Sequence, residues 1–311
     1  MTEPLRPLSI GELLDRTFSL YRQNFKLFIG VAILGPAAML CFQIVMLVLG
    51  LGGRNARAMV QNPGWFFTVF TLGAIFYLIG YAISAAASIR AVGAVYLGKT
   101  ITIGEAYASV KGRIFRLIMV MIWSAIVGMG GAYLLILLGV AIFAGAMAGG
   151  RALAGTAGTW IGGAIGVVAI IACALAAIGW VVRYALSVQS CVLENLKVGA
   201  SLKRSKVLTK GDRTRVVTIG IVCTAIAFVT GMIFGLPGAF IPVKDLVARQ
   251  AVTHVFSLIA SALCAPLFTV AMSLLYYDER VRKEAFDLQL MMESLDMPAP
   301  QQTATPTPSL G

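Results

Sequence analysis

Two arginines lie inside long apolar runs of the sequence. Arg90 and Arg183 are 93 residues apart, and an arginine at the centre of a bilayer costs about 2.5–3.5 kcal/mol on insertion scales. If the hydrocarbon core begins at Trp65 or Trp160 and takes about 20 residues, both guanidiniums reach the headgroup interface instead. There they either snorkel or pair with a neighbouring helix, or they hold a lipid phosphate or another anionic substrate at two equivalent places.

A second group of basic residues follows Arg183. Seven lysines and arginines stand between residues 197 and 215, among them Lys203, Arg204 and Lys206. Each cation near a membrane surface attracts anionic lipid by about 1 kcal/mol, and a basic segment equally fixes the orientation of its neighbouring spans. We predict that these three residues, with the two arginines of the apolar runs, are the candidate contacts for lipid headgroups or other anions.

Two carboxylates close apolar runs of the sequence. Glu194 and Asp278 each have an arginine nearby with which they can pair, Arg204 or Arg280. Structural ion pairs explain these residues better than chemistry does.

The sequence offers no constellation for catalysis, metal binding or cofactor binding. Its one histidine, His254, has no partner cluster, and its five cysteines are isolated, without metal or disulfide spacing. The acidic residues all lie outside the centres of the apolar runs, whereas a proton-coupled pump usually buries a carboxylate there. We therefore expect no cofactor, no metal and no enzymatic activity.

The composition places the chain in the membrane. Of 311 residues, 59% are hydrophobic and only 12% are charged, and the mean hydropathy is +0.88, whereas a soluble domain has about a quarter charged residues. The formal charge of +12 is concentrated beside the apolar runs. It therefore indicates membrane topology and anionic lipid as a partner, and not nucleic acid.

A six-residue motif occurs three times along the chain. SIGELL occupies residues 9–14, TIGEAY residues 102–107, and a degraded copy, KVGASL, residues 197–202. The first two copies have Ser or Thr followed three residues later by Glu, which is the capping box of a helix N-terminus. Each copy begins an amphipathic stretch that leads into a long apolar run. We predict an all-α polytopic membrane protein, built as three tandem units of an amphipathic elbow helix plus a transmembrane hairpin.

Six apolar runs are long enough to form transmembrane helices. The predicted spans are residues 27–51, 65–97, 114–147, 160–193, 216–241 and 246–277. The three units cover residues 9–97, 102–193 and 197–277. They belong to one membrane domain, residues 1–295, which ends in a cytosolic helix at 278–295. Residues 296–311 form a disordered tail. Lysines and arginines number 18 on one side and 5 on the other, which places both termini and all elbows in the cytoplasm.

Three segments resemble a known family of bacterial multi-pass proteins. They are PLSIGELLDRTF at residues 7–18, GASLKRS at 199–205 and YYDERVRKEAFDL at 276–288, and they are similar to the membrane domain of glycerophosphoryl diester phosphodiesterases and related membrane proteins. The resemblance implies a bacterial inner-membrane protein. It does not imply phosphodiesterase activity, because the chemistry of the family's enzymes belongs to a separate soluble barrel rich in His and Glu ligands, and this chain has one histidine.

Two functions remain open at this point. The first is a non-catalytic scaffold that interacts with anionic lipids or with a membrane or cytosolic protein partner, in support of glycerophospholipid or envelope metabolism. The second is a transporter or lipid-translocating permease, which repeated hairpins and equivalent arginines favour. Three repeats differ from the paired halves of the common transporters, so the first function is the preferred hypothesis.

Overall fold

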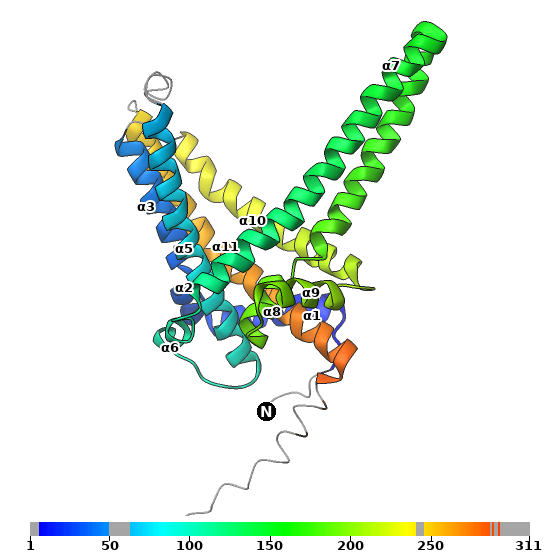
Figure 1. The fold of residues 1–311 in the computed structure, drawn as a ribbon. Helices are drawn as coiled ribbons and strands as arrows, with labels where there is room; N and C mark the ends of the chain where they lie inside the picture. Colours follow the sequence, from blue (N-terminus) through cyan, green and yellow to red (C-terminus); the bar gives the residue numbers. More distant parts are fainter. Residues whose placement is uncertain (1–5, 50–62, 241–245, 287, 289–291, 293–311) are drawn as a thin grey trace, which may run out of the picture.

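The protein is described by a computed structural model that covers residues 6–49, 63–240, 246–286, 288 and 292. Within these residues the regular elements are α-helices (Figure 1), which confirms the predicted all-α class. In chain order they are α1 (Ile10–Gln23), α2 (Phe25–Ala32), α3 (Leu34–Val48), α5 (Pro63–Tyr96), α6 (Ile103–Ala108), α7 (Ile114–Val182), α8 (Ser187–Glu194), α9 (Val198–Leu208), α10 (Arg213–Phe240) and α11 (Leu246–Glu284).

Among the described residues, five helical runs are long and apolar enough to cross a membrane. They are Phe25–Val48, Pro63–Tyr96, Ile114–Glu194, Arg213–Leu236 and Val247–Glu284. These runs indicate an integral, multi-pass membrane protein. The helical runs number five, and not the six predicted, because the run Ile114–Glu194 contains both the third and the fourth predicted span.

The helix α7 is itself a hairpin. Its backbone departs from helical geometry at Ala154 and at Gly155, whose φ is +60°, and Figure 1 shows the two arms running side by side from this point. A Cβ atom at Gly158 would lie 1.9 Å from the carbonyl oxygen of Gly150. Glycine is therefore required twice, for the left-handed turn and for direct backbone contact between the arms. Residues 148–159, which lie between the third and fourth predicted spans, are helical except at this two-residue turn.

The fourth predicted span, residues 160–193, is also not one helix. The α7 helix ends at Val182, and α8 begins after a turn. The hydroxyl of Ser205, in α9, donates to the carbonyl of Arg183 at 2.8 Å and accepts from the amide of Leu186 at 3.1 Å. A contact from a segment distant in sequence thus satisfies the backbone groups that this break leaves open.

Both ends of the predicted topology need a further correction. The first predicted span is divided into α2 and α3, which meet at Ile33. The helix predicted at 278–295 is the continuation of α11 up to Glu284, where Ala285 takes a φ of +48°, and the described residues 286, 288 and 292 are again helical. The predicted tail, 296–311, lies outside the described residues.

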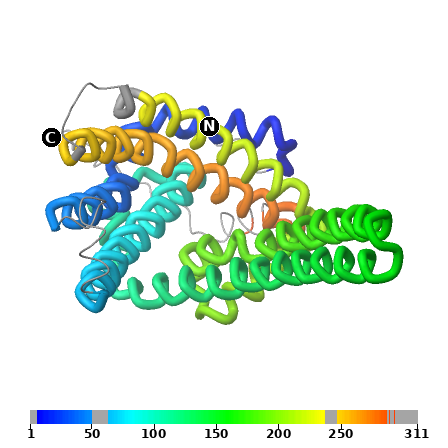
Figure 2. The backbone as a smooth tube through the Cα atoms, turned by 90° about the horizontal axis from the view of Figure 1, so that it is seen from above, coloured from blue at the N-terminus to red at the C-terminus, as the bar shows by residue number. Residues whose placement is uncertain are grey.

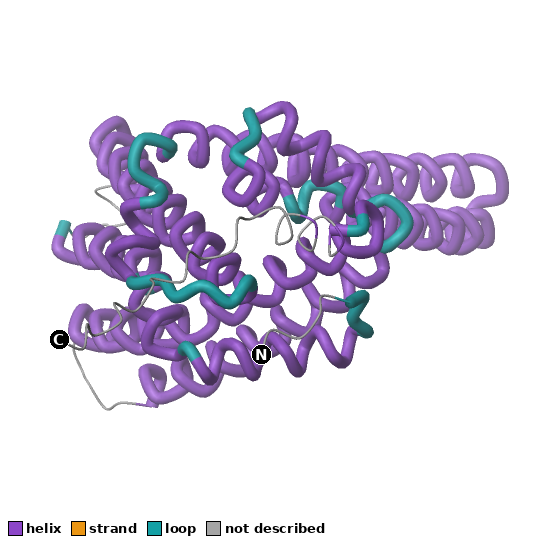
Figure 3. Tube along the Cα trace, turned by 90° about the horizontal axis from the view of Figure 1, so that it is seen from below, coloured by secondary structure: helices purple, strands orange, loops and turns teal. Residues whose placement is uncertain are grey.

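Each copy of the repeated motif begins a short helix, α1, α6 or α9. Both predicted capping boxes are present: the amide of Glu12 donates to Ser9 Oγ at 3.2 Å, and the amide of Glu105 donates to Thr102 Oγ1 at 3.3 Å. The third helix starts at Lys197, whose side chain makes no cap. These three helices, together with α8, lie at one end of the molecule, which we call the elbow end (Figure 1; Figure 3 shows it from below).

The hydrophobic core is concentrated at the elbow end, around α11. This helix contacts α1, α2, α3, α5, α8, α9 and α10, and the largest fully buried apolar side chains include Leu13, Phe28, Ile89 and Leu274. Away from the elbow end the long helices diverge, and the α7 hairpin projects from the others (Figures 1 and 2). Its apolar side chains are exposed there, as Trp160 is at 83%, which suits contact with lipid chains.

Candidate functional site

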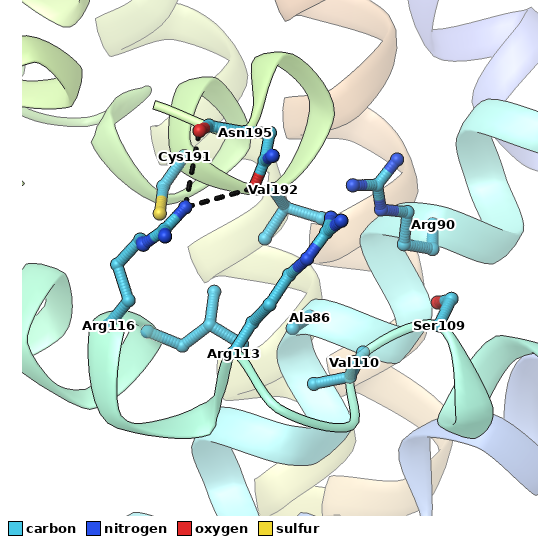
Figure 4. Close-up of a pocket in the computed structure, with 10 residues that line it drawn as sticks. Ala86, Arg90, Ser109, Val110, Arg113, Arg116, Cys191, Val192 and Asn195 are labelled. Carbon is cyan, nitrogen blue, oxygen red and sulfur yellow. Dashed lines mark hydrogen bonds between the residues drawn. The ribbon is translucent and has the colours of Figure 1, made fainter. Parts of the chain in front are cut away.

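A small pocket at the elbow end contains three arginines (Figure 4). Arg90 comes from α5, Arg113 directly precedes α7, and Arg116 belongs to the first turn of α7. The pocket has an empty volume of about 260 Å³. The other residues that line it are Ala86, Ser109, Val110, Leu117, Cys191, Val192 and Asn195.

The chain brings these arginines together by reversing its direction between α5 and α7. After α6 it turns at Gly112, whose φ of +83° is open to glycine at little cost, and the next residue, Arg113, is the N-cap of α7. Because α5 and α7 pack against each other, the start of α7 lies beside the part of α5 that holds Arg90. In the sequence, Arg90 is more than twenty residues from Arg113 and Arg116, so their proximity cannot be read from the spacing.

The three guanidiniums have no carboxylate among the residues that line the pocket. Arg116 Nη1 donates to the carbonyl and to the side-chain oxygen of Asn195, at 3.2 and 2.9 Å. The guanidiniums of Arg90 and Arg113 make no hydrogen bond or ion pair with the described part of the chain. Like charges held together in this way repel each other, so the site is favourable to an anion.

The N-terminus of α7 adds to this positive potential. No side chain caps it, and its first turn contains no acidic residue. The first amides of a helix are unpaired and carry the positive end of its dipole, which attracts phosphate and other anions. The guanidiniums and the first amides of α7 therefore both attract an anion to this pocket.

Arg183, the predicted equivalent of Arg90, lies elsewhere. Its guanidinium carbon is 5.0 Å from the centroid of the Trp180 ring, and its Nε is buried without a hydrogen-bond partner among the described residues. It does not line the arginine pocket. Positions that correspond in the sequence repeat thus have different surroundings, and the structure does not make one site of Arg90 and Arg183.

The three predicted basic residues of α9 separate into two kinds. Lys203 and Lys206 are exposed, and the ammonium of Lys206 lies 5.1 Å from the Tyr184 ring centroid. Arg204 faces the protein, where its Nε donates to both oxygens of Glu194 at 3.0 Å and its Nη2 to Glu284 at 2.6 Å. Lys203 and Lys206 can therefore reach headgroups, whereas Arg204 is held in the protein.

The predicted carboxylates belong to two ion-pair clusters. In the first, Glu194 and Glu284 share Arg204. The hydrogen bonds that Arg204 donates to these carboxylates, above all the one to Glu284, raise the pKa of Arg204 above its ordinary value. Tyr276 donates a hydrogen bond to Glu194, and Arg280 Nε lies 3.2 Å from Glu284. The structure thus contains an ion pair between Glu194 and Arg204.

Asp278 forms the second cluster, and its partner is not Arg280. Its side chain is fully buried and accepts from Arg215 at 2.6 Å, from Arg282 at 2.9 Å and from the amide of Leu8 at 2.7 Å. This carboxylate joins the start of α10 and the end of α11 to the residues that precede α1.

Comparisons with family models, with curated proteins and with solved structures gave no match to this chain. The resemblance of residues 7–18, 199–205 and 276–288 to the phosphodiesterase membrane domain therefore stays an expectation.

Sequence reasoning missed Arg113 and Arg116 as site residues. They stood in the sequence as basic residues between the second elbow and the next span. The signal that could have selected them is their place at the first turn of a long apolar helix, with Gly112 before them and no acidic residue beside them.

Proposed function

We propose that this protein is a non-catalytic, multi-pass protein of the bacterial inner membrane that binds anionic lipid headgroups, as a lipid- or partner-binding scaffold in glycerophospholipid or envelope metabolism. The observation that carries this proposal is the pocket of Arg90, Arg113 and Arg116, which lacks a carboxylate. Planar guanidiniums bind phosphate through paired hydrogen bonds. The pocket lies at the end of apolar helices, which is the depth of the headgroups.

The topology that we propose has six crossings, made by α2 with α3, α5, each arm of α7, α10 and α11. In this arrangement an elbow helix and a transmembrane hairpin repeat three times, and both termini are cytoplasmic. Support comes from the position of α1, α6 and α9 at one end of the molecule and from the excess of basic residues in the segments that contain them. The arginine pocket then faces headgroups of the cytoplasmic leaflet.

The proposal is tested by native purification and mass spectrometry of the lipids that remain bound. We expect Arg90→Ala and Arg113→Ala to lose bound anionic lipid. The matched control is Arg183→Ala, which removes an arginine from the corresponding repeat position outside the pocket and should retain the lipid. Equal lipid content in all three variants and the wild type would refute headgroup binding by the pocket.

One observation favours the second function, a permease. A groove with an empty volume of about 1590 Å³ lies between the α7 hairpin and α10, with α11 also contributing, and its lining is almost wholly apolar. Vesicles that contain the protein and a fluorescent phospholipid would show transport as movement of the probe between leaflets. A scaffold predicts no acceleration over protein-free vesicles, whereas acceleration that is lost with Arg113→Ala would favour the permease.

A further inference from the structure

We infer that the arginine pocket of Arg90, Arg113 and Arg116 is a phosphomonoester site. It takes a terminal phosphate group with two negative charges, either as the headgroup of a lipid such as phosphatidic acid or as a phosphate free in solution. This inference rests on the proposed binding of anionic headgroups and narrows it to one class of headgroup.

The charge balance of the elbow end supports this class. Glu194, which precedes the pocket residue Asn195, is already paired with Arg204, as is Glu284, and Asp278 is paired with Arg215. Glu105, which is closer to Arg113 in sequence, is held by Thr102 in the capping box of α6. The pocket therefore presents three uncompensated guanidiniums to a ligand. A phosphomonoester carries about −1.5 to −2 charges at neutral pH, whereas a phosphodiester headgroup carries one and leaves more of the positive charge unbalanced.

The hydrogen-bond donors fit a group with three terminal oxygens. The guanidinium N–H groups of Arg90 and Arg113 are free of partners in the described residues, and Arg116 is held in position by Asn195. Figure 4 shows the side chains of Arg90 and Arg113 reaching the same side of the pocket from separate elements. Three forked donors can each bind an oxygen of a monoester, while a diester has only two unsubstituted oxygens to offer.

The size and lining of the pocket limit what it can hold. It is a shallow recess and not a closed cavity, because its empty volume of about 260 Å³ includes open solvent. Ala86, Val110, Leu117 and Val192 form apolar walls beside the guanidiniums. A phosphate group would thus bind at the mouth of the recess, where the guanidiniums can reach it, with the rest of a lipid outside.

The test compares a monoester lipid with a diester lipid in one experiment. The purified protein in detergent is incubated with equal amounts of phosphatidic acid and phosphatidylglycerol, and bound lipid is counted by native mass spectrometry. We expect at least tenfold more phosphatidic acid, and about a tenfold loss of it in Arg113→Gln and in Arg90→Gln, as expected for one charged hydrogen-bonding group. Arg22→Gln, which removes an exposed arginine of α1 outside the pocket, should bind like the wild type.

Two further measurements make the result specific. Preference for phosphatidic acid should fall below about pH 6, where the monoester dianion gains one proton and keeps a single negative charge, and a diester preference would not change there. Inorganic phosphate at millimolar concentration should displace the lipid if free phosphate is the source, and should fail to do so if acyl chains contribute to binding. Either result supports the monoester class.

The failing outcomes are distinguishable. Equal binding of the two lipids, with loss of both in the arginine variants, would overturn the monoester inference and leave headgroup binding in place. Unchanged binding of both lipids in Arg113→Gln would overturn both proposals. Arg113 is exposed and outside the helices, so this variant retains the fold even if Arg90→Gln does not, which size-exclusion chromatography would show.

Discussion

Asp278 is predicted to be the carboxylate on which the packing of the elbow end depends most. Its side chain has no exposed surface and accepts hydrogen bonds from Arg215, Arg282 and the amide of Leu8. In Asp278→Asn the shape of the side chain is kept, but the negative charge is lost. The two guanidiniums then face a neutral amide in a site from which water is largely excluded.

The size of the effect follows from the burial of this cluster. The Arg215 side chain is only 12% exposed, and removing one partner of a buried ion pair costs about 3–5 kcal/mol, because the other charge stays without compensation. For a chain of about this size, 1 kcal/mol shifts the unfolding temperature by roughly 2 °C. We therefore expect the melting temperature of Asp278→Asn to fall by about 6–10 °C.

The assay is thermal unfolding of the detergent-purified protein, followed by intrinsic fluorescence. Asp15→Asn is the matched control, because it makes the same chemical change at an exposed position of α1 and should leave the melting temperature unchanged. In a double-mutant cycle, Asp278→Asn combined with Arg215→Gln should cost less than the sum of the single changes. Equal melting temperatures for the Asp278 and Asp15 variants, or strict additivity in the cycle, would refute this reasoning.

Two further predictions concern backbone contact and pH. Gly158→Val should destabilise the α7 hairpin by about 1–3 kcal/mol or more, because the new Cβ would lie 1.9 Å from the carbonyl oxygen of Gly150. Gly163→Val is the control, because a Cβ there has no neighbour within 4 Å. Equal thermal stability of the two variants would contradict the packing of the arms. The backbone amide of Ser9, with help from Arg6, lowers the pKa of Glu12 to about 2. Its contribution to the stability of α1 is therefore present above a pH of about 4.5 and is lost as the pH falls toward 2; a carboxyl resonance of Glu12 that titrates near pH 4.5 would contradict this.

The sequence predicted local features well because their causes are local. The capping boxes at Ser9 and Thr102 depend on side chains three residues apart, and the structure contains both. The membrane class follows from the length and hydropathy of the runs. Chain breaks were predicted less well. Residues 148–159, between two predicted spans, are helical except for a two-residue turn, and the fourth span stops early, at a turn whose backbone bonds to Ser205.

The candidate site likewise has features with local causes, which the sequence predicted, and features that depend on distant contacts, which it did not. The sequence by itself determined that Arg90 is a candidate functional residue, because a charged side chain is costly inside the hydrocarbon of a bilayer. It also suggested Arg183 as an equivalent, because a repeat in sequence implies similar local structure. Only the tertiary structure decided that Arg113 and Arg116 share the pocket with Arg90. Partners of this kind are set by the packing of α5 against the start of α7, which depends on contacts between distant segments and leaves no trace in the spacing of residues.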